Sequence, residues 1–203
     1  MRVIGGCRGG IRLAGFTGDR IRPTSDKVKG AVFSILDNLV PDYDTFADLF
    51  AGTGGMGIEA LSRGAENVYF FDRDPKSLAV VRENLKRTGF SDSAEVNRMP
   101  ARRGLDRLAA DEVRCDVIFM DPPYRDVVDS LSLFDEIERA QLLAADGVIV
   151  LEHDKSDIIP NKVSAFMKIK EKMYGNTVIS FFRRGEKRKQ SFIRALLIRL
   201  RSL

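Results

Sequence analysis

Residues 46–64 read FADLFAGTGGMGIEALSRG, and this stretch decides the predicted fold of the 203-residue chain. Its first five residues form a short, mostly apolar run that is typical of a buried β-strand. Glycines follow at positions 52, 54, 55 and 57, after which a helix is predicted from Ile58 to Arg63, ended by Gly64. The stretch therefore predicts a strand, a glycine-rich turn and a helix, which together begin a β-α-β unit.

The same alternation of strand and helix continues toward the C-terminus. Further strands are predicted at 68–71, 94–97, 115–120 and 147–151, and helices at 75–87, 103–110 and 131–143. Two β runs, 163–173 and 177–182, form a closing hairpin around residues 174–176. Repeated β-α units give parallel strands covered by helices on both faces, and the hairpin adds one antiparallel strand. We therefore expect an α/β, Rossmann-like fold with a seven-stranded, mostly parallel sheet.

The segment before this unit is predicted to be a small β/α arm. Glycines punctuate short apolar pieces in residues 1–22, and Thr24 or Ser25 can cap a helix that runs to about Asn38. We divide the chain into a β arm at 1–24 packed on the main domain, a main domain at 25–184 and a basic tail at 185–203. Docking on the domain, RNA binding, contact with a membrane surface and disorder are all open for the tail.

The glycine turn matches a nucleotide-binding pattern. Residues 52–57 fit G-x-G-x-x-G, and Asp72 ends the next strand, about 20 residues beyond the first glycine. The glycines allow close approach to the backbone, the helix start offers N–H groups to an anion, and Asp72 can accept from a ribose hydroxyl. The pattern predicts an adenosine-containing cofactor, but it leaves NAD and S-adenosylmethionine both open.

A second informative stretch, Asp121-Pro122-Pro123-Tyr124, ends the strand predicted at 115–120. Two prolines make the loop rigid and leave carbonyls as acceptors. The carboxylate and a proline carbonyl can accept hydrogen bonds from an exocyclic amine, and Tyr124 can stack on its ring. Ligands of parallel sheets bind beyond the carboxyl ends of the strands, where the glycine turn, Asp72 and this stretch all fall. We therefore predict one site in which a cofactor meets a flat base.

Two features favour S-adenosylmethionine over the NAD of a dehydrogenase. Asp48 stands just before the glycine turn, where a carboxylate is unfavourable beside a pyrophosphate and favourable beside the ammonium group of a methionine moiety. Residues 121–124 have no evident role in hydride transfer.

Composition and charge limit the class of protein. Hydrophobic residues at 44% and charged residues at 31% are typical of a soluble globular protein, without a long apolar run or a signal peptide. Two distant cysteines predict reduced thiols and a cytoplasmic location. His153 is the only histidine, which argues against a metal site and a Ser-His-Asp triad. The net charge is +4, and basic residues concentrate at both ends of the chain, which indicates a polyanionic partner.

The sequence resembles the RsmD-type 16S ribosomal RNA guanine-N2 methyltransferases. Residues 48–54 and 57–65 resemble the motif I of that family, and residues 121–124 match its catalytic motif IV. Residues 2–6 and 22–28 resemble its opening, and 174–177 with 180–182 resemble its closing hairpin, so the resemblance spans about 1–184. Residues 97–101 lack the acid that many such enzymes place near the adenine, which leaves Arg98 and Met99 as positional candidates for that contact.

The resemblance implies a class I S-adenosylmethionine-dependent methyltransferase that modifies the exocyclic N2 of a guanine in small-subunit rRNA. The implied partner is rRNA or an assembly intermediate of the small ribosomal subunit, with no membrane and no metal, and we expect a monomer. The expected catalytic residues are Asp121, Pro122, Pro123 and Tyr124. The expected cofactor-binding residues are Asp48, Phe50, Gly52, Thr53, Gly54, Gly57, Asp72 and Arg73. Phosphate contacts are expected from Arg20, Arg22, Lys27 and Lys29, which flank the junction of arm and helix.

Two other functions stay open. The Asp121–Tyr124 stretch also suits adenine N6 or cytosine N4 of another RNA or of DNA, although no separate DNA-reading domain is evident. A non-catalytic RNA-binding factor of ribosome assembly is the other alternative, and the intact glycines, Asp72 and Asp121 argue against it.

Overall fold

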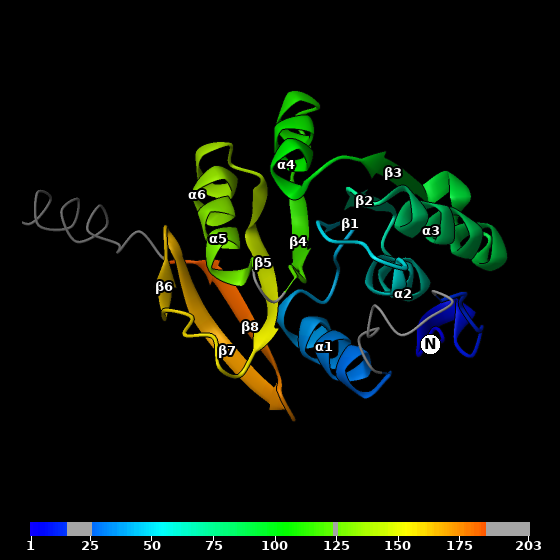
Figure 1. Cartoon of the computed structure of the whole chain (residues 1–203), viewed down its shortest axis with the longest axis horizontal. Helices are drawn as coiled ribbons and strands as arrows, with labels where there is room; N and C mark the ends of the chain where they lie inside the picture. The colour runs from blue at the N-terminus through cyan, green and yellow to red at the C-terminus, as the bar shows by residue number, and fades with distance from the viewer. Residues whose placement is uncertain (16–25, 124–125, 186–203) are drawn as a thin grey trace, which may run out of the picture.

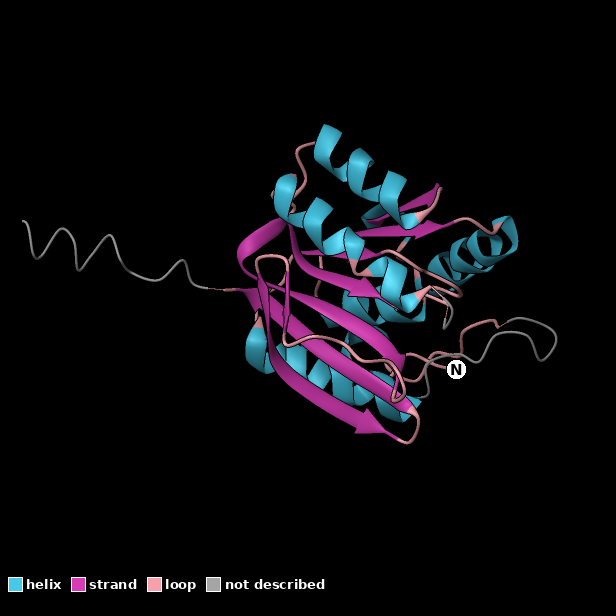
Figure 2. Cartoon of the chain, turned by 60° about the vertical axis from the view of Figure 1, so that its left-hand side comes forward, coloured by secondary structure: helices cyan, strands magenta, loops and turns pink. Residues whose placement is uncertain are grey.

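The computed structural model describes residues 1–15, 26–123 and 126–185 of the chain. One eight-stranded sheet runs through it in the order β3-β2-β1-β4-β5-β8-β7-β6 (Figure 1). Helices cover both faces of this sheet (Figure 2). The expected α/β architecture with a mostly parallel sheet is thus confirmed.

Five parallel strands form the half of the sheet that carries the glycine turn. They are β1 (Thr45–Asp48), β2 (Asn67–Asp72), β3 (Ala94–Arg98), β4 (Cys115–Met120) and β5 (Leu143–Asp154). The chain leaves β1 toward β2 on one side and later returns to place β4 on its other side. This reversal of strand order creates a crevice at the carboxyl ends of β1 and β4, where α/β proteins bind ligands.

The closing hairpin completes the sheet. β7 (Phe166–Tyr174) and β8 (Thr177–Arg184) pair antiparallel, and β8 pairs antiparallel with β5. Gly175 adopts a φ of 67° at the turn between them, a conformation that favours glycine. The two-residue strand β6 (Lys162–Val163) adds an eighth strand at the edge, where seven were expected.

Two apolar cores lie on opposite faces of the sheet because neighbouring strand residues point to opposite sides. Phe46, Val117 and Val148 face one core, and the residues that follow them, Ala47, Ile118 and Ile149, face the other. The first core is covered by α1 (Asp26–Leu39), α2 (Gly55–Arg63) and α3 (Pro75–Thr88). The second is covered mainly by α4 (Ala101–Ala110) and α6 (Ser132–Arg139), with α5 (Val127–Ser130) beside them.

The helix predicted at 131–143 was placed too far along the chain. Helical structure begins at Val127 and ends at Arg139, and Leu143 already belongs to β5. Leu142 and Leu143 extended the apparent apolar stripe, but both pack in the core after the chain turns at Gln141, whose φ is 52°. An apolar pair can therefore look helical in sequence while it begins a buried strand.

The N-terminal residues contain little regular structure. Arg2 and Arg12 form an isolated antiparallel bridge around a short 3-10 helix, η1 (Gly6–Arg8). A second 3-10 helix, η2 (Ser91–Ser93), precedes β3. Within the described ranges, no helix has the length and apolar character needed to span a membrane.

Candidate active site

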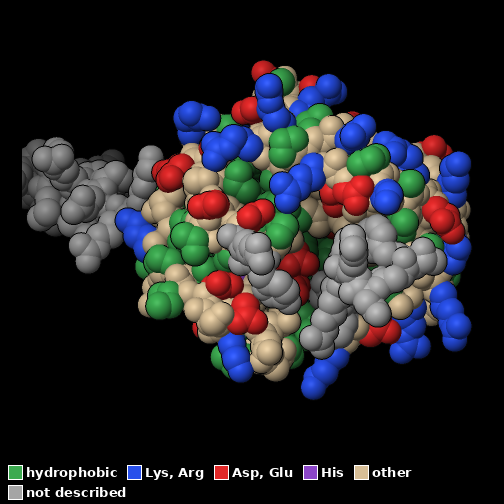
Figure 3. All heavy atoms as spheres, in the orientation of Figure 1, with side chains coloured by type: hydrophobic (Ala, Val, Ile, Leu, Met, Phe, Trp, Pro, Cys, Tyr) green, Lys and Arg blue, Asp and Glu red, His purple; other side chains and the backbone are tan. Residues whose placement is uncertain are grey.

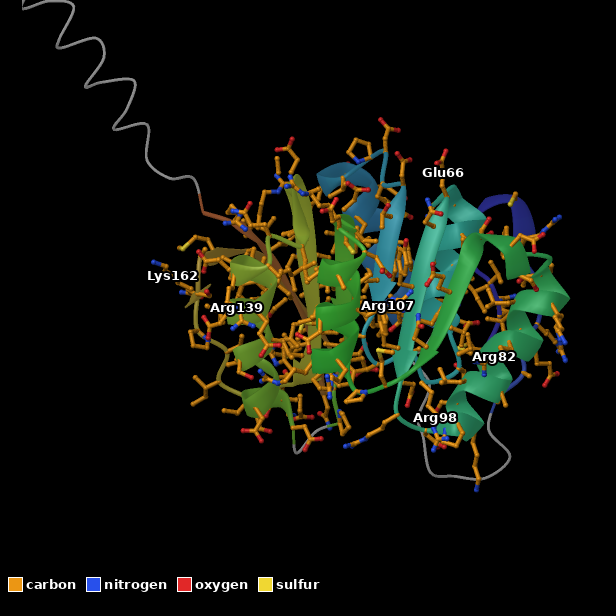
Figure 4. The ribbon with its side chains drawn as sticks, turned by 90° about the horizontal axis from the view of Figure 1, so that it is seen from above. Glu66, Arg82, Arg98, Arg107, Arg139 and Lys162 are labelled. Atoms are coloured by element: carbon orange, nitrogen blue, oxygen red, sulfur yellow. The ribbon has the colours of Figure 1, made fainter. Side chains whose placement is uncertain are left out.

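A cavity of about 450 Å³ opens at the carboxyl ends of the parallel strands. Figure 4 shows the direction of the parallel strands. Glu66, just before β2, lies at their amino ends, and Arg98, at the end of β3, lies at their carboxyl ends. In the space-filling view, acidic side chains are visible inside the hollow that faces the viewer (Figure 3). The cavity is lined by Leu49, Phe50, Gly52, Asp72, Arg73, Asp74, Ser77, Met99, Pro100, Ala101, Asp121, Pro122, Pro123, Asp126 and Glu152.

The glycine turn is shaped by backbone conformation and by close packing. Gly52 and Gly54 adopt φ angles of 52° and 79°, which favour glycine. Gly57 permits α2 to approach β2, because a Cβ there would lie 2.3 Å from the ring of Phe70. The turn is thus held close to the sheet, and the start of α2 lies beside the cavity.

Asp72 fixes the position of the turn. Its Oδ2 accepts the N–H of Gly52 at 2.9 Å, and its Oδ1 accepts the N–H of Asp74 at 2.8 Å. Each oxygen of an ionised carboxylate has a further lone pair, so Asp72 can also accept from the hydroxyl groups of a ribose. This geometry fits the role that the sequence predicts for Asp72.

The fully buried carboxyl group of Asp48 neighbours the half-buried Asp121, which lines the cavity. Asp48 is 1% exposed, and burial together with the neighbouring Asp121 raises its pKa to about 7, although the N–H groups of Gly57 and Phe50 oppose the rise. Burial likewise raises the pKa of Asp121 to about 7. Oδ1 of Asp48 has no hydrogen-bond partner among the described residues. A ligand cation at Oδ1 of Asp48 would pair with that carboxylate and favour its ionised form.

Apolar groups form the other part of the cavity wall. Leu49 follows β1, and Met99, Pro100 and Ala101 join β3 to α4. The N–H of Met99 is fixed by the carbonyl of Asp72 at 3.1 Å. Apolar groups of this kind commonly line the pockets of flat ligands. Met99, a positional candidate for the adenine contact, lines the cavity, whereas Arg98 does not.

Seven of the sixteen predicted site residues line this cavity. Phe50, Gly52, Asp72, Arg73, Asp121, Pro122 and Pro123 line it. Asp48, Thr53, Gly54 and Gly57 lie outside its lining, and Arg73 pairs with Asp126 at 3.6 Å. Lys27 is exposed on α1. Tyr124, Arg20 and Arg22 lie outside the described residues.

The structure corrects the prediction for Lys29. Its side chain is 1% exposed, and its Nζ donates to the carbonyl of Arg2 at 2.5 Å and lies 3.4 Å from Glu59. Lys29 shares a helix face with Val32, Phe33 and Leu36, all of which are buried, so the spacing i, i+3, i+4, i+7 already pointed it inward. A lysine held this way cannot reach an RNA phosphate.

Sequence reasoning missed several wall residues. Pro100, Ala101, Ser77 and Glu152 line the cavity but belong to no recognisable pattern. Their position just after β3, in the first turn of α3 and near the end of β5 was the available signal, since those points adjoin the carboxyl ends of strands. Among the described residues, no group of His, Cys, Asp or Glu is arranged to hold a metal ion.

The chain matches one protein-family model and several proteins named as rRNA methyltransferases. The family model described as conserved hypothetical protein 95 matches residues 1–183. The putative rRNA methyltransferase YlbH of Bacillus subtilis is 40% identical over 188 residues, which cover 91% of this chain and 99% of that protein. The ribosomal RNA small subunit methyltransferase D of Escherichia coli K12 is 26% identical, covering 91% of this chain and 90% of that protein.

Solved structures show the same likeness. A putative methyltransferase from Escherichia coli, yhhF, superposes with a TM-score of 0.77 at 26% identity, covering 92% of this chain and 99% of that one. A hypothetical protein of Thermus thermophilus has a TM-score of 0.76 at 28% identity, covering 90% and 99% of the two chains.

Proposed function

The chain belongs to the conserved hypothetical protein 95 family, and from this premise we propose that it transfers a methyl group from S-adenosylmethionine to the exocyclic N2 of a guanine in 16S rRNA. The resemblance to RsmD-type enzymes that the sequence showed is confirmed at the level of the family, by the match over residues 1–183 and by relatives named as rRNA methyltransferases. Support for guanine N2 comes from the match of residues 121–124 to the catalytic motif of those enzymes.

One observation carries the proposal: a single cavity is lined by both the glycine turn with Asp72 and the Asp121–Pro123 corner. Two reacting groups gain most of their rate advantage when one site holds both in position. S-adenosylmethionine, when bound, supplies an electrophilic methyl group on a cationic sulfonium.

The residues of this cavity suit that cofactor. Asp72 would accept the ribose hydroxyls, and the apolar wall at Leu49 and Met99 would contact the adenine. Asp48 lies behind the cavity lining, and its unpartnered Oδ1 would accept from an ammonium group placed there, which would offset the cost of burying this carboxylate beside Asp121.

The Asp121–Pro123 corner would hold the base. The carbonyl of Pro123 accepts the N–H of Asp126 at 2.7 Å, which fixes the corner. The carboxylate of Asp121 and the carbonyl of Pro122 would then accept the two hydrogens of the amine. These bonds would favour a pyramidal nitrogen with an available lone pair. With its pKa raised to about 7, Asp121 can also take the proton that the amine loses.

The test is transfer of labelled methyl groups from S-adenosylmethionine to unmodified 30S subunits, naked 16S rRNA or tRNA, followed by nucleoside analysis. We expect label in N2-methylguanosine from small-subunit RNA. Label in methyladenosine or methylcytidine would transfer the assignment to another amino-methyltransferase, and the absence of label from every substrate would refute the proposed reaction. The Asp129→Asn variant, which changes an exposed carboxylate on α5, is the matched control for substitutions of Asp121.

We further propose that the protein acts as a monomer in the cytoplasm, where the free thiols of Cys7 and Cys115 stay reduced. Its RNA substrate is naked rRNA or an assembling small subunit. The chain is organised as an arm at 1–24, a methyltransferase domain at 25–184 and a tail at 185–203.

A further inference from the structure

The described part of the N-terminal arm, residues 1–15, is held by buried polar side chains of α2 and α3. Figure 1 shows the arm beside α2. Glu59, fully buried on α2, accepts the N–H groups of Ile4 at 2.7 Å and Gly5 at 2.8 Å. Ser62, one turn later, accepts the N–H of Arg8 at 2.9 Å and donates to the carbonyl of Gly5 at 2.5 Å. The arm is therefore docked by specific hydrogen bonds, not only by apolar contact.

Asn84 on α3 joins this arm to the glycine turn. Its side chain is 0% exposed and makes three hydrogen bonds. Its Oδ1 accepts the N–H of Ala14 at 2.7 Å, and its Nδ2 donates to the carbonyl of Ala14 at 3.1 Å and to the carbonyl of Thr53 at 3.0 Å. One buried amide thus binds the end of the arm and the centre of the turn together.

The turn continues directly into the cavity. Thr53 follows Gly52, which lines the cavity and donates to Asp72. Met1 reaches the same turn from the arm, with its sulfur 3.7 Å from the hydroxyl of Thr53. If the arm left its place, the amide of Asn84 would lose two of its three partners in a buried setting, which is costly. The docked arm and the ordered turn therefore stabilise each other.

The outer side of the arm is basic. Arg12 is exposed and makes no ion pair with any described acidic residue. Arg8 lies over the ring of Phe90 at 5.7 Å and donates to the carbonyl of Thr88 at 2.9 Å, and it also lacks an ion pair within the described part of the chain. An RNA backbone would find these charges in fixed positions only while the arm is docked.

We propose that Asn84 is a positioning residue that couples the arm to the glycine turn, so that RNA on the arm and S-adenosylmethionine in the cavity strengthen each other's binding. This inference rests on the proposed function. The two states are the docked and the undocked arm, and both ligands favour the docked state. Thermodynamic linkage requires that each ligand raise the affinity for the other by the same factor.

The test measures this factor with S-adenosylhomocysteine and naked 16S rRNA as probes. Dissociation constants for each probe are determined with and without the other, for the wild-type chain and the Asn84→Ala variant. We expect a factor of about 10 in the wild type, inside the usual range for coupled sites, and a factor below about two in the variant. Hydrogen exchange without RNA gives a second readout: S-adenosylhomocysteine should slow exchange of arm amides in the wild type and not in the variant.

Thr88→Val is the matched control. Thr88 is 2% exposed on the same helix, and its hydroxyl bonds only to the carbonyls of Asn84 and Leu85 within α3, at 2.8 and 3.2 Å. This variant should lose stability but keep the coupling factor. Ala14→Pro removes the arm donor to Asn84 without changing α3, so it reports on the coupling even if Asn84→Ala fails to fold.

Three results would overturn the inference. A coupling factor that survives in both Asn84→Ala and Ala14→Pro would exclude the role of Asn84. A wild-type factor of one would refute the coupling and leave the proposed function intact. A wild-type chain that does not bind S-adenosylhomocysteine would contradict the proposed function itself, and the inference would fall with it.

Discussion

Replacement of Asp48 by asparagine should make the ligand-free protein more stable above neutral pH. Asp48 is 1% exposed beside Asp121, and its Oδ1 lacks a partner among the described residues. Asparagine has nearly the same shape and can keep one oxygen as acceptor for the backbone N–H groups, but it carries no charge. The variant therefore removes the cost of ionising a carboxyl group in this place.

The magnitude follows from the pKa of about 7 that burial and Asp121 impose on Asp48, against an ordinary value of 3.8. Because the folded-state pKa is raised, the stability that the carboxyl group contributes is complete below pH 3.8 and is lost as the pH rises to about 7. One pKa unit corresponds to about 1.4 kcal/mol. Between pH 5 and pH 8, the wild type should therefore lose about 2–3 kcal/mol that Asp48→Asn retains.

The assay is urea denaturation of the wild type, Asp48→Asn and the exposed-site control Asp129→Asn at pH 5, 6, 7 and 8. The difference in unfolding free energy between Asp48→Asn and wild type should grow with pH, whereas that of the control should stay constant. Parallel pH profiles for all three proteins would refute the argument. The same Asp48→Asn variant should bind S-adenosylhomocysteine at least about 10-fold more weakly, because a lost charge-assisted bond is worth about 1.5–3 kcal/mol.

Three further substitutions separate catalysis, arm docking and the buried ion pair. Asp121→Asn should lower methyl transfer by about 100-fold, the lower range for a lost acid–base group, while calorimetry shows the dissociation constant of S-adenosylhomocysteine within about three-fold of wild type. Gly6→Ala should destabilise the chain by about 2–4 kcal/mol in chemical denaturation. The φ of 72° is strained for alanine, and the new Cβ would lie 1.7 Å from the carbonyl oxygen of Ser62. An unchanged midpoint of denaturation would mean that the arm does not dock as described. Glu59→Gln should cost about 3–5 kcal/mol by the same assay, since it leaves Lys29 buried without its counter-ion, and a loss below about 1 kcal/mol would contradict that role.

The sheet was predictable because its signals are local. Each parallel strand is a short apolar run bounded by turn residues, and such runs give β4 at Cys115–Met120 with the boundaries that the sequence predicted. The carboxyl ends of parallel strands lie at one side of a sheet, so the sequence alone places Asp72 and Asp121 together. The helix at 131–143 failed because apolar residues such as Leu142 and Leu143 satisfy a helix and a buried strand equally well, and tertiary packing decides between them.

The polar groups that hold the arm could not be predicted in this way. Glu59 and its partner Ile4 are 55 residues apart, and Asn84 and Ala14 are 70 residues apart. Helical periodicity shows that such side chains point inward, as it does for Lys29, but it does not show which backbone groups they meet. Those partners follow from how the arm packs against the folded domain, which is a property of the whole chain.

Two buried carboxyl groups within one short stretch show how structure separates a stabilising charge from a functional one. Glu59 is surrounded by partners: two backbone N–H groups, Lys29 at 3.4 Å and Arg63 at 3.0 Å. Asp48 faces another acid and keeps one oxygen without a partner among the described residues. Neutralising the first should therefore weaken the fold, whereas neutralising the second should strengthen it above neutral pH and weaken the cofactor site. A fold that retains the unfavourable arrangement at Asp48 is best explained by a cationic ligand that completes it.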